Sequence, residues 1–284
     1  MDIANLPRPV GFVLGGGGSL GAVQVGMLQA LGEHGVAPDL VAGTSIGSIN
    51  GAVLALDPKG AANRLSHLWP KIKREDILPG GPLDQARTLR RTKTHLFPNN
   101  SLATVITDFL GEATTFDDLE LPFAAVTMDV ATARPHVVRE GRLLPALLAS
   151  AAIPGVWPPV EHEGHLLYDG GIVANVPLRQ AQDIGARSLV VLDCAFAGQL
   201  PETPETIAEV LLYTGLVMMR AQAVLEAPLV AAALPVVYLP GPDPRPMSPL
   251  DFHHTPELIE ASYTAARSFL EHLDITGPGS VVVG

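Results

Sequence analysis

The sequence predicts an α/β protein whose mainly parallel central sheet is covered by helices on both faces. Short apolar runs alternate along the chain with segments whose apolar residues recur at the spacing of a helix. The run at residues 188–193 contains four consecutive apolar residues, which is typical of a strand buried on both of its faces. Strands that alternate with helices in this way favour parallel pairing through helical crossovers.

The first two strand–helix units follow each other closely. Residues 10–14 form an apolar run that enters a glycine-rich segment, and a predicted helix over residues 22–34 ends before Gly35. Residues 39–42 form the second predicted strand. The second predicted helix, residues 46–56, ends at an Asp-Pro pair that disfavours helix continuation.

The next long stretch, residues 59–122, is predicted to be helical. It holds many of the basic residues of the chain, among them Arg90 and Arg91. Ser101 is placed to cap a helix that ends at Gly111, with its apolar residues on one face. This stretch separates the second helix from the next clear strand.

The rest of the chain returns to strands and helices. We expect a strand at 122–130 with a hairpin partner at 136–139, a helix at 142–152, and a hairpin of 160–162 with 165–168. Pro177 at a first helical position and Gly185 bracket a further helix. We further expect a long helix or helix pair at 207–234, a last strand at 235–239 and a helix at 256–273 capped by Thr255. The tail from residue 275 would either be loosely ordered or form an edge.

Composition narrows the class of protein. The net charge of −11 and a pI near 5.2 argue against a nucleic-acid-binding protein. The single cysteine, Cys194, cannot form an intramolecular disulfide and lies in an apolar run, so we expect it to be buried. No secretory signal is visible, and charged residues and Pro228 interrupt the longest apolar candidate for a membrane span. We therefore expect a cytoplasmic protein that can lie peripherally at membranes.

The pentapeptide from Gly43 to Gly47 carries the first sign of chemistry. It has the pattern Gly-x-Ser-x-Gly, with Ser45 between a predicted strand and a predicted helix, as a nucleophile elbow requires. A serine there stands at a helix N-terminus, where the backbone dipole favours negative charge. The alternative is a serine that only forms a turn.

The glycine-rich segment before the first helix has three interpretations. Gly16, Gly18 and Gly21 match a dinucleotide fingerprint, but no acidic residue ends the second strand. A phosphate-binding loop would need a Gly-Lys-Ser/Thr sequence, which is missing. The third is an oxyanion hole, in which backbone N–H groups stabilise the charge that develops on a carbonyl oxygen. A tight turn that lets strand and helix pack is compatible with all three.

A serine nucleophile needs a base. Nine histidines leave a Ser-His-Asp triad open, with His253, His254 or His272 in the chain order of α/β-hydrolases, although none sits in a motif of a catalytic turn. Asp169 is the better candidate, because it follows an apolar strand end and precedes Gly170 and Gly171. A turn-forming aspartate is the alternative.

Taken together, the glycine-rich loop, the Gly-x-Ser-x-Gly elbow and the downstream Asp-Gly-Gly resemble the patatin-like phospholipase family. The stretch from Ala149 to Val160 is similar to the segment before the aspartate in that family. The resemblance runs from about residue 10 to residue 193. It implies a three-layer α/β/α fold and a Ser-Asp dyad without histidine, with no cofactor and no metal.

Residue by residue, the resemblance makes Ser45 the nucleophile and Asp169 the base. It makes the backbone N–H groups of Gly16, Gly17 and Gly18 the oxyanion-hole candidates. The motif glycines are Gly21, Gly43, Gly47, Gly170 and Gly171. Many members have arginine before the last glycine of the loop, where this chain has Leu20, so recognition of a phosphate head group by charge is in doubt at this position.

These features lead to a hypothesis about organisation and function. Residues 10–193 would form the catalytic core, with residues 59–122 as a helical insert over the site, and residues 194–284 would complete the same domain. The leading hypothesis is a serine acyl hydrolase acting on lipid esters, with transient membrane-surface contact and no nucleic-acid partner. The alternatives are a non-catalytic lipid-binding or regulatory module of the same fold and, on the glycine cluster alone, a nucleotide-binding oxidoreductase.

Overall fold

The computed structural model describes residues 3–194, 203–242, 249–273 and 281–283. Its centre is a nine-stranded sheet in the order β5-β6-β3-β2-β1-β7-β8-β9, with β4 paired to β3. The strands are β1 (Val10–Leu14), β2 (Leu40–Thr44), β3 (Phe123–Asp129), β4 (Arg134–Val138), β5 (Val160–His162), β6 (His165–Asp169), β7 (Ser188–Leu192), β8 (Val236–Tyr238) and β9 (Val281–Val283).

Most of the sheet is parallel, as the alternation of strands and helices predicts. The pairs that run from β3 through β2, β1, β7 and β8 to β9 are all parallel. Both β4 and β6 pair with β3 in antiparallel register, and β5 pairs with β6 as the predicted hairpin. The ends of β2 and β6 therefore lie on either side of the end of β3, which brings Ser45 and Asp169 to one edge of the sheet.

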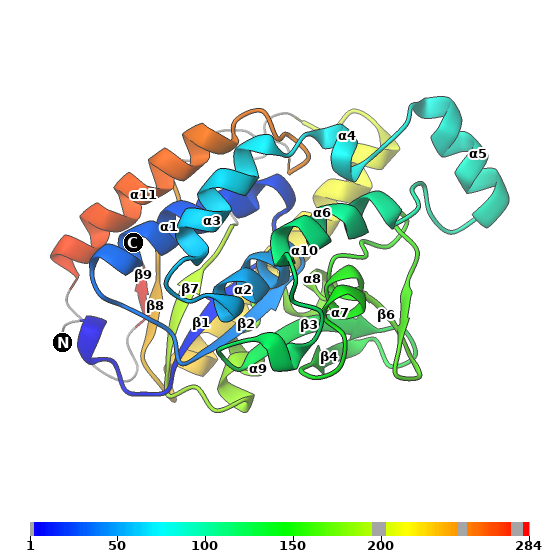
Figure 1. Cartoon of the computed structure of the whole chain (residues 1–284). Helices are drawn as coiled ribbons and strands as arrows, with labels where there is room; N and C mark the ends of the chain where they lie inside the picture. The colour runs from blue at the N-terminus through cyan, green and yellow to red at the C-terminus, as the bar shows by residue number, and fades with distance from the viewer. Residues whose placement is uncertain (1–2, 195–202, 243–248, 274–280, 284) are drawn as a thin grey trace.

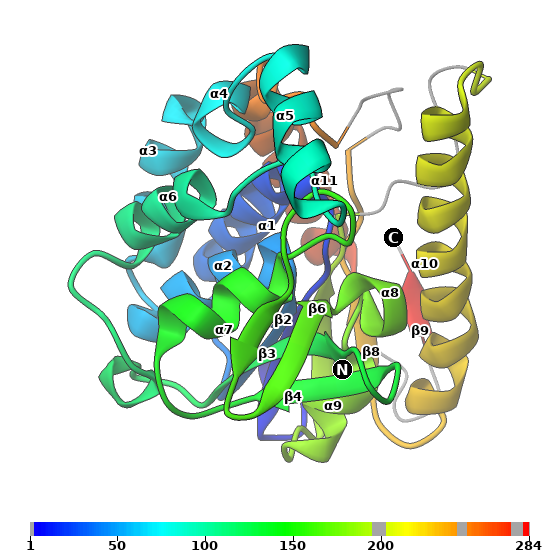
Figure 2. The same cartoon turned by 90° about the vertical axis from the view of Figure 1, so that its right-hand side faces the viewer.

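Helices cover the sheet on both faces (Figure 1). These helices include α1 (Ala22–Glu33), α2 (Ile46–Leu56), α6 (Asn100–Leu110), α7 (Leu143–Ser150), α10 (Ile207–Ala231) and α11 (Thr255–His272). Alternate side chains of β1 supply two separate cores: Phe12 and Leu14 pack with α1, α2 and α11, whereas Val13 packs with residues of the opposite layer. That layer contains α8 (Gly171–Ala174), α9 (Leu178–Asp183) and α10, seen on the right of Figure 2. The fold is thus the expected three-layer α/β/α arrangement.

The stretch between α2 and β3 is helical, as predicted. It contains α3 (Ala61–Leu68), η3 (Trp69–Lys71), α4 (Arg74–Ile77), α5 (Pro82–Thr92), α6 and η4 (Phe116–Asp118). Its α6 packs against α2 and α7. By contrast, α5 has no buried residue and projects from the molecule (Figure 1).

Several predicted boundaries are wrong by one or a few residues. Asn99, not Ser101, precedes α6; α9 begins after Pro177, which is the capping residue; and α11 starts with Thr255 as a helical residue. The strand predicted as the last, β8, is followed by β9, which pairs with it from the tail. Within the described ranges, none of the helices combines the length and apolar character of a membrane-spanning segment.

Candidate active site

Ser45 occupies the turn between β2 and α2, in a conformation that few residues adopt. Its φ of 55° and ψ of −126° lie in a region where a side chain is strained. The two flanking glycines are required by close packing. A Cβ on Gly43 would lie 2.3 Å from the carbonyl oxygen of Gly47, and a Cβ on Gly47 would lie 2.2 Å from that of Leu14. The backbone therefore has the sharp strand–turn–helix form of a nucleophile elbow.

The side chain of Ser45 meets Asp169, which lies 124 residues further along the chain. The Ser45 hydroxyl donates a hydrogen bond of 2.7 Å to Oδ2 of Asp169. Asp169 is the last residue of β6, and its Oδ1 accepts a 2.7 Å hydrogen bond from the N–H of Gly171. Each carboxylate oxygen thus has one donor, and the carboxylate is held facing the serine.

Burial gives this carboxylate the properties of a base. Asp169 is only 3% exposed, and burial raises its pKa from the ordinary 3.8 to about 6, against the lowering effect of the hydrogen bonds from Gly171 and Ser45. A carboxylate with this pKa is ionised at neutral pH yet holds a proton more readily than an exposed aspartate. A proton acceptor with a pKa close to the working pH is well matched to general-base catalysis.

Ser150 holds the backbone at the elbow and was not singled out by the sequence. Its hydroxyl accepts a 3.0 Å hydrogen bond from the N–H of Ser45 and donates one of 2.7 Å to the carbonyl of Val126. Ser150 is fully buried at the end of α7. It therefore links the strained turn to β3. The only sequence signal was its place in the stretch from Ala149 to Val160 that resembles the family.

The glycine-rich loop runs alongside the dyad. A Cβ on Gly16 would lie 3.1 Å from Cβ of Ser45, so this part of the loop contacts Ser45. The N–H of Gly16 donates to the carbonyl of Asn175 at 3.0 Å, which corrects its assignment as an oxyanion donor: the group is used to hold the loop. Within the described residues, the N–H groups of Gly17 and Gly18 donate to no protein acceptor.

Close contacts on the other side of the glycine-rich loop leave no room for a side chain at Gly17 or Gly18. A Cβ on Gly17 would lie 2.4 Å from Cβ of Cys194, and one on Gly18, whose φ is +60°, would lie 2.3 Å from the carbonyl oxygen of Pro249. Cys194 is fully buried, as predicted, and burial raises the pKa of its thiol well above the ordinary value. The thiol packs against the loop and is not a candidate nucleophile.

Comparison with known proteins identifies the family of this site. Residues 12–181, from β1 to α9, match the model of the family described as patatin-like phospholipase. The chain belongs to the patatin-like phospholipase family.

Relatives and solved structures agree with this membership. The patatin-like phospholipase domain-containing protein ZK370.4 of Caenorhabditis elegans is 35% identical over 71% of this chain, and lysophospholipase nte1 of Aspergillus terreus is 31% identical over 66% of it. The match spans only 15% and 12% of those two proteins. The fold is similar to that of VipD from Legionella pneumophila, with a TM-score of 0.50 and 14% identity over 93% of this chain and 67% of that one.

Two of the three candidate histidines, His254 and His272, have partners away from the Ser45–Asp169 pair. The imidazole of His254 faces Asp251 and Glu257, and the Nδ1 of His272 faces the carbonyl of Ser268 on its own helix. Among the described hydrogen bonds, none joins Ser45 to a histidine. The geometry brings together the serine and the aspartate that the family resemblance implies, and no described hydrogen bond joins either of them to His253, His254 or His272.

A buried polar network connects the loop with the elbow helix. Gln24 on α1 donates to the carbonyls of Gly15 and Leu192, and Asn50 on α2 donates to Gln24 and to the carbonyl of Gly21. The indole N–H of Trp69 donates to Asn50 at 3.1 Å. Sequence reasoning did not find this network, because its residues are far apart in the chain and belong to no motif. Through it the insert, the loop and α2 hold one another in place.

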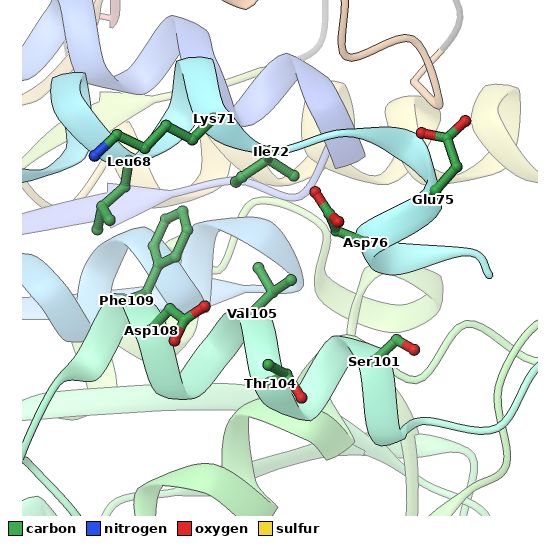
Figure 3. A pocket seen from close by; sticks show the side chains of 10 residues that line it. All are labelled: Leu68, Lys71, Ile72, Glu75, Asp76, Ser101, Thr104, Val105, Asp108 and Phe109. Carbon is green, nitrogen blue, oxygen red and sulfur yellow. The ribbon is translucent and has the colours of Figure 1, made fainter.

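A groove of about 700 Å³ lies within the insert, between η3 and α4 on one side and α6 on the other (Figure 3). Its lining includes the apolar side chains of Leu68, Ile72, Val105 and Phe109 and the carboxylates of Asp76 and Asp108. Neither dyad residue lines it. The groove is therefore separate from the Ser45–Asp169 pair.

Proposed function

We propose that this chain is a serine acyl hydrolase that cleaves carboxylic ester bonds of lipids, of the phospholipase or lysophospholipase type. The observation that carries the proposal is the 2.7 Å hydrogen bond between the hydroxyl of Ser45 and the carboxylate of Asp169. It occurs in a chain of the patatin-like phospholipase family, at the end of a strand and the start of a helix. A relative named as a lysophospholipase supports the substrate class.

In the first half of the reaction, Asp169 acts as a base. Its Oδ2 takes the proton of the Ser45 hydroxyl while the serine oxygen forms a bond to the carbonyl carbon of the ester. The carbonyl oxygen becomes an oxyanion. When this tetrahedral intermediate collapses, the bond to the alcohol breaks, and the protonated Asp169 returns its proton to the leaving alcohol. An acyl group is then esterified to Ser45.

The second half repeats the same steps with water. Asp169 takes a proton from a water molecule while the oxygen of that water attacks the acyl carbon. When the acyl bond to Ser45 breaks, Asp169 returns the proton to the oxygen of Ser45. The fatty acid is released and the dyad is restored. This cycle needs one group that is a base before each attack and an acid after it, which suits a carboxylate whose pKa is about 6.

The free N–H groups of Gly17 and Gly18 are the proposed donors to the oxyanion. The contact of the loop with Ser45 and the lack of a protein acceptor for either group support this role. Donors of this kind stabilise the transition state more than the bound ester, and loss of one typically costs about 3 kcal/mol.

The insert, residues 59–122, is proposed to govern access and substrate choice and not the chemical steps. It lies between the elbow helix and β3 and contains none of the dyad or loop residues. Its α5 has no buried residue and includes Arg90 and Arg91, so it can contact an anionic lipid surface without disturbing the core.

The test is mass spectrometry of a defined lipid mixture before and after incubation with the wild type and with Ser45→Ala. We expect the wild type to release fatty acids from one or more phospholipids or lysophospholipids, and Ser45→Ala to release none. Equal release by both proteins would contradict the proposal. No release by either would favour the non-catalytic lipid-binding alternative.

A further inference from the structure

The long helix α10 exposes a face without a single charge. Every α10 side chain that the structure describes as exposed is uncharged. The most exposed are Ile207 at 82%, Leu225 at 71% and Met218 at 66%. Two residues of this face carry a hydroxyl, Tyr213 and Thr214, and that of Thr214 donates back to the carbonyl of Val210 on the same helix. The outer face is formed by Ile207, Val210, Tyr213, Thr214, Val217, Met218, Ala221, Val224, Leu225, Pro228 and Leu229.

The opposite face of α10 packs next to the active site. The side chain of Gln222 donates a hydrogen bond to the carbonyl of Val173 in α8, the short helix that begins at Gly171. A Cβ on Gly171 would lie 2.5 Å from Cε of Met219, so Met219 rests on the residue whose N–H holds the Asp169 carboxylate. Figure 2 shows α10 beside α8 at the side of the molecule. The outer face is therefore about one helix diameter, roughly 10 Å, from the turn that contains Asp169 and Gly171.

The size of this face sets it apart from ordinary scattered apolar residues. From Ile207 to Leu229 the helix runs for about 33 Å, and at 100° per residue the eleven exposed positions cover an arc of about 160°. Contiguous exposed apolar surface of this extent is rare on soluble proteins and usually marks an interaction site.

The shape and charge of the face favour a lipid surface over a helix from another protein. A helix that pairs with one other helix has a narrow apolar seam flanked by charged residues. Here the apolar arc is wide, and the charged α10 side chains that the structure describes, Arg220 and Glu226, are only partly exposed. A helix that lies in the surface of a bilayer has such a wide apolar face. The chain as a whole carries a charge of −11, and this face has no basic residue to attract anionic lipid.

We propose that the outer face of α10 docks this protein on the surface of an electrically neutral, phosphatidylcholine-type lipid aggregate, beside the Ser45–Asp169 dyad. The inference rests on the proposed function for the use of this contact, because a lipid hydrolase must reach esters that are held in an aggregate. The docking itself requires no turnover, so it can be tested separately.

The test uses the full chain with Ser45→Ala, which cannot hydrolyse the vesicles. Flotation with phosphatidylcholine vesicles is measured for this protein, for the same protein with Val217→Asp and Val224→Asp, and for a control with Ala261→Asp and Ser268→Asp. The control residues are also exposed and seven positions apart, on α11, and they add the same charge. We expect the α10 pair to reduce the vesicle-bound fraction at least about tenfold and the α11 pair to leave it unchanged.

A second measurement guards against a variant that does not fold. Cys194 is the single cysteine and is buried, so Val217→Cys or, as the control, Ser268→Cys can be labelled with an environment-sensitive fluorophore. We expect a blue shift with phosphatidylcholine vesicles at position 217 and none at position 268.

The outcomes separate this inference from its alternatives and from the proposed function. Equal vesicle binding by the α10 and α11 pairs, or binding only to anionic phosphatidylglycerol vesicles, would overturn the docking. A second contrary outcome combines two results: the α10 pair leaves vesicle binding unchanged, and light scattering shows that it converts a dimer into a monomer. That outcome would assign the face to a second copy of the chain. Loss of binding by the α10 pair, together with no lipid hydrolysis by the wild-type protein, would sustain the docking and refute the proposed function alone.

Discussion

Replacing Asp169 by asparagine is expected to abolish ester hydrolysis and, at pH 8, to make the protein more stable. Burial raises the pKa of Asp169 from 3.8 to about 6 in the folded state. Each pKa unit corresponds to 1.36 kcal/mol, so the ionised carboxylate lowers the free energy of unfolding by about 3 kcal/mol. Asparagine has the same shape and no charge, and it therefore removes this penalty.

Part of the gain is offset by weaker hydrogen bonds. The Oδ1 of asparagine can still accept the N–H of Gly171, but an amide nitrogen replaces the oxygen that accepts from Ser45. Loss of one such hydrogen bond costs about 1 kcal/mol. The expected net gain in the free energy of unfolding is therefore about 2 kcal/mol at pH 8.

The sign of the difference depends on pH. Below pH 3.8 the carboxyl is protonated in both the folded and the unfolded chain, and no penalty exists. Between pH 3.8 and about 6 the folded chain keeps a proton that the unfolded chain has released, so wild-type stability falls as the pH rises. Above about pH 6 the penalty is complete. The variant should thus be more stable than the wild type at pH 8 and less stable, by about 0.5 kcal/mol, at pH 4, where roughly 0.5 kcal/mol of the penalty is already present.

The assay is urea denaturation at pH 4, 6 and 8, combined with hydrolysis of p-nitrophenyl butyrate. Glu260→Gln is the control, because Glu260 is exposed on α11 and its replacement removes one negative charge without touching the site. We expect a loss of activity of at least about a thousandfold for Asp169→Asn and none for the control. A stability difference that does not change with pH, or near-normal turnover, would refute the assignment of Asp169 as a buried base.

Four further predictions test the same site. The value of kcat/KM for p-nitrophenyl butyrate should rise with pH through an apparent pKa near 6, because only ionised Asp169 accepts the serine proton, and a rate that is flat from pH 4.5 to 8 would contradict this. Gly17→Val should reduce kcat at least about tenfold and change KM little in steady-state kinetics, and unchanged kcat in a folded protein would exclude the loop as the oxyanion hole. Ser45→Gly should be more stable than Ser45→Ala by about 1 kcal/mol in thermal unfolding, because glycine relieves the strained φ, and equal stability would argue against strain. The double change Arg90→Glu and Arg91→Glu should lower hydrolysis of anionic phospholipid vesicles relative to p-nitrophenyl butyrate, whereas an equal loss on both substrates would mean that the insert supports the site itself.

The sheet was predictable because its central strands are buried on both faces. Such strands are short apolar runs bounded by turn residues, and the run that becomes β7 is fully buried, as its sequence suggests. The ends of helices were less predictable, because more than one nearby polar residue can serve as the capping residue. Asn99 and Ser101 are both suitable, and the structure begins α6 after Asn99.

That Ser45 and Asp169 lie close together was predictable only through motifs. Ser45 and Asp169 are far apart in the chain, and no local periodicity says that the ends of β2 and β6 meet. The hydrogen bonds that hold the surrounding backbone were not predictable for the same reason. Ser150 meets Ser45 only in the folded chain, and the N–H of Gly16 donates to a carbonyl of a distant segment. The exposed face of α10 was equally hidden, because an apolar helix has the same composition whether it is buried or faces outward.

The most direct measurement of the central claim is covalent labelling by a fluorophosphonate, followed by mass spectrometry of the digested protein. An activated serine oxygen attacks the phosphorus, releases fluoride and forms a stable adduct. We predict one adduct, on the peptide that contains Ser45, with labelling abolished by Ser45→Ala and greatly slowed by Asp169→Asn. An adduct on another residue, or labelling that persists in Ser45→Ala, would contradict the account of Ser45 as the nucleophile.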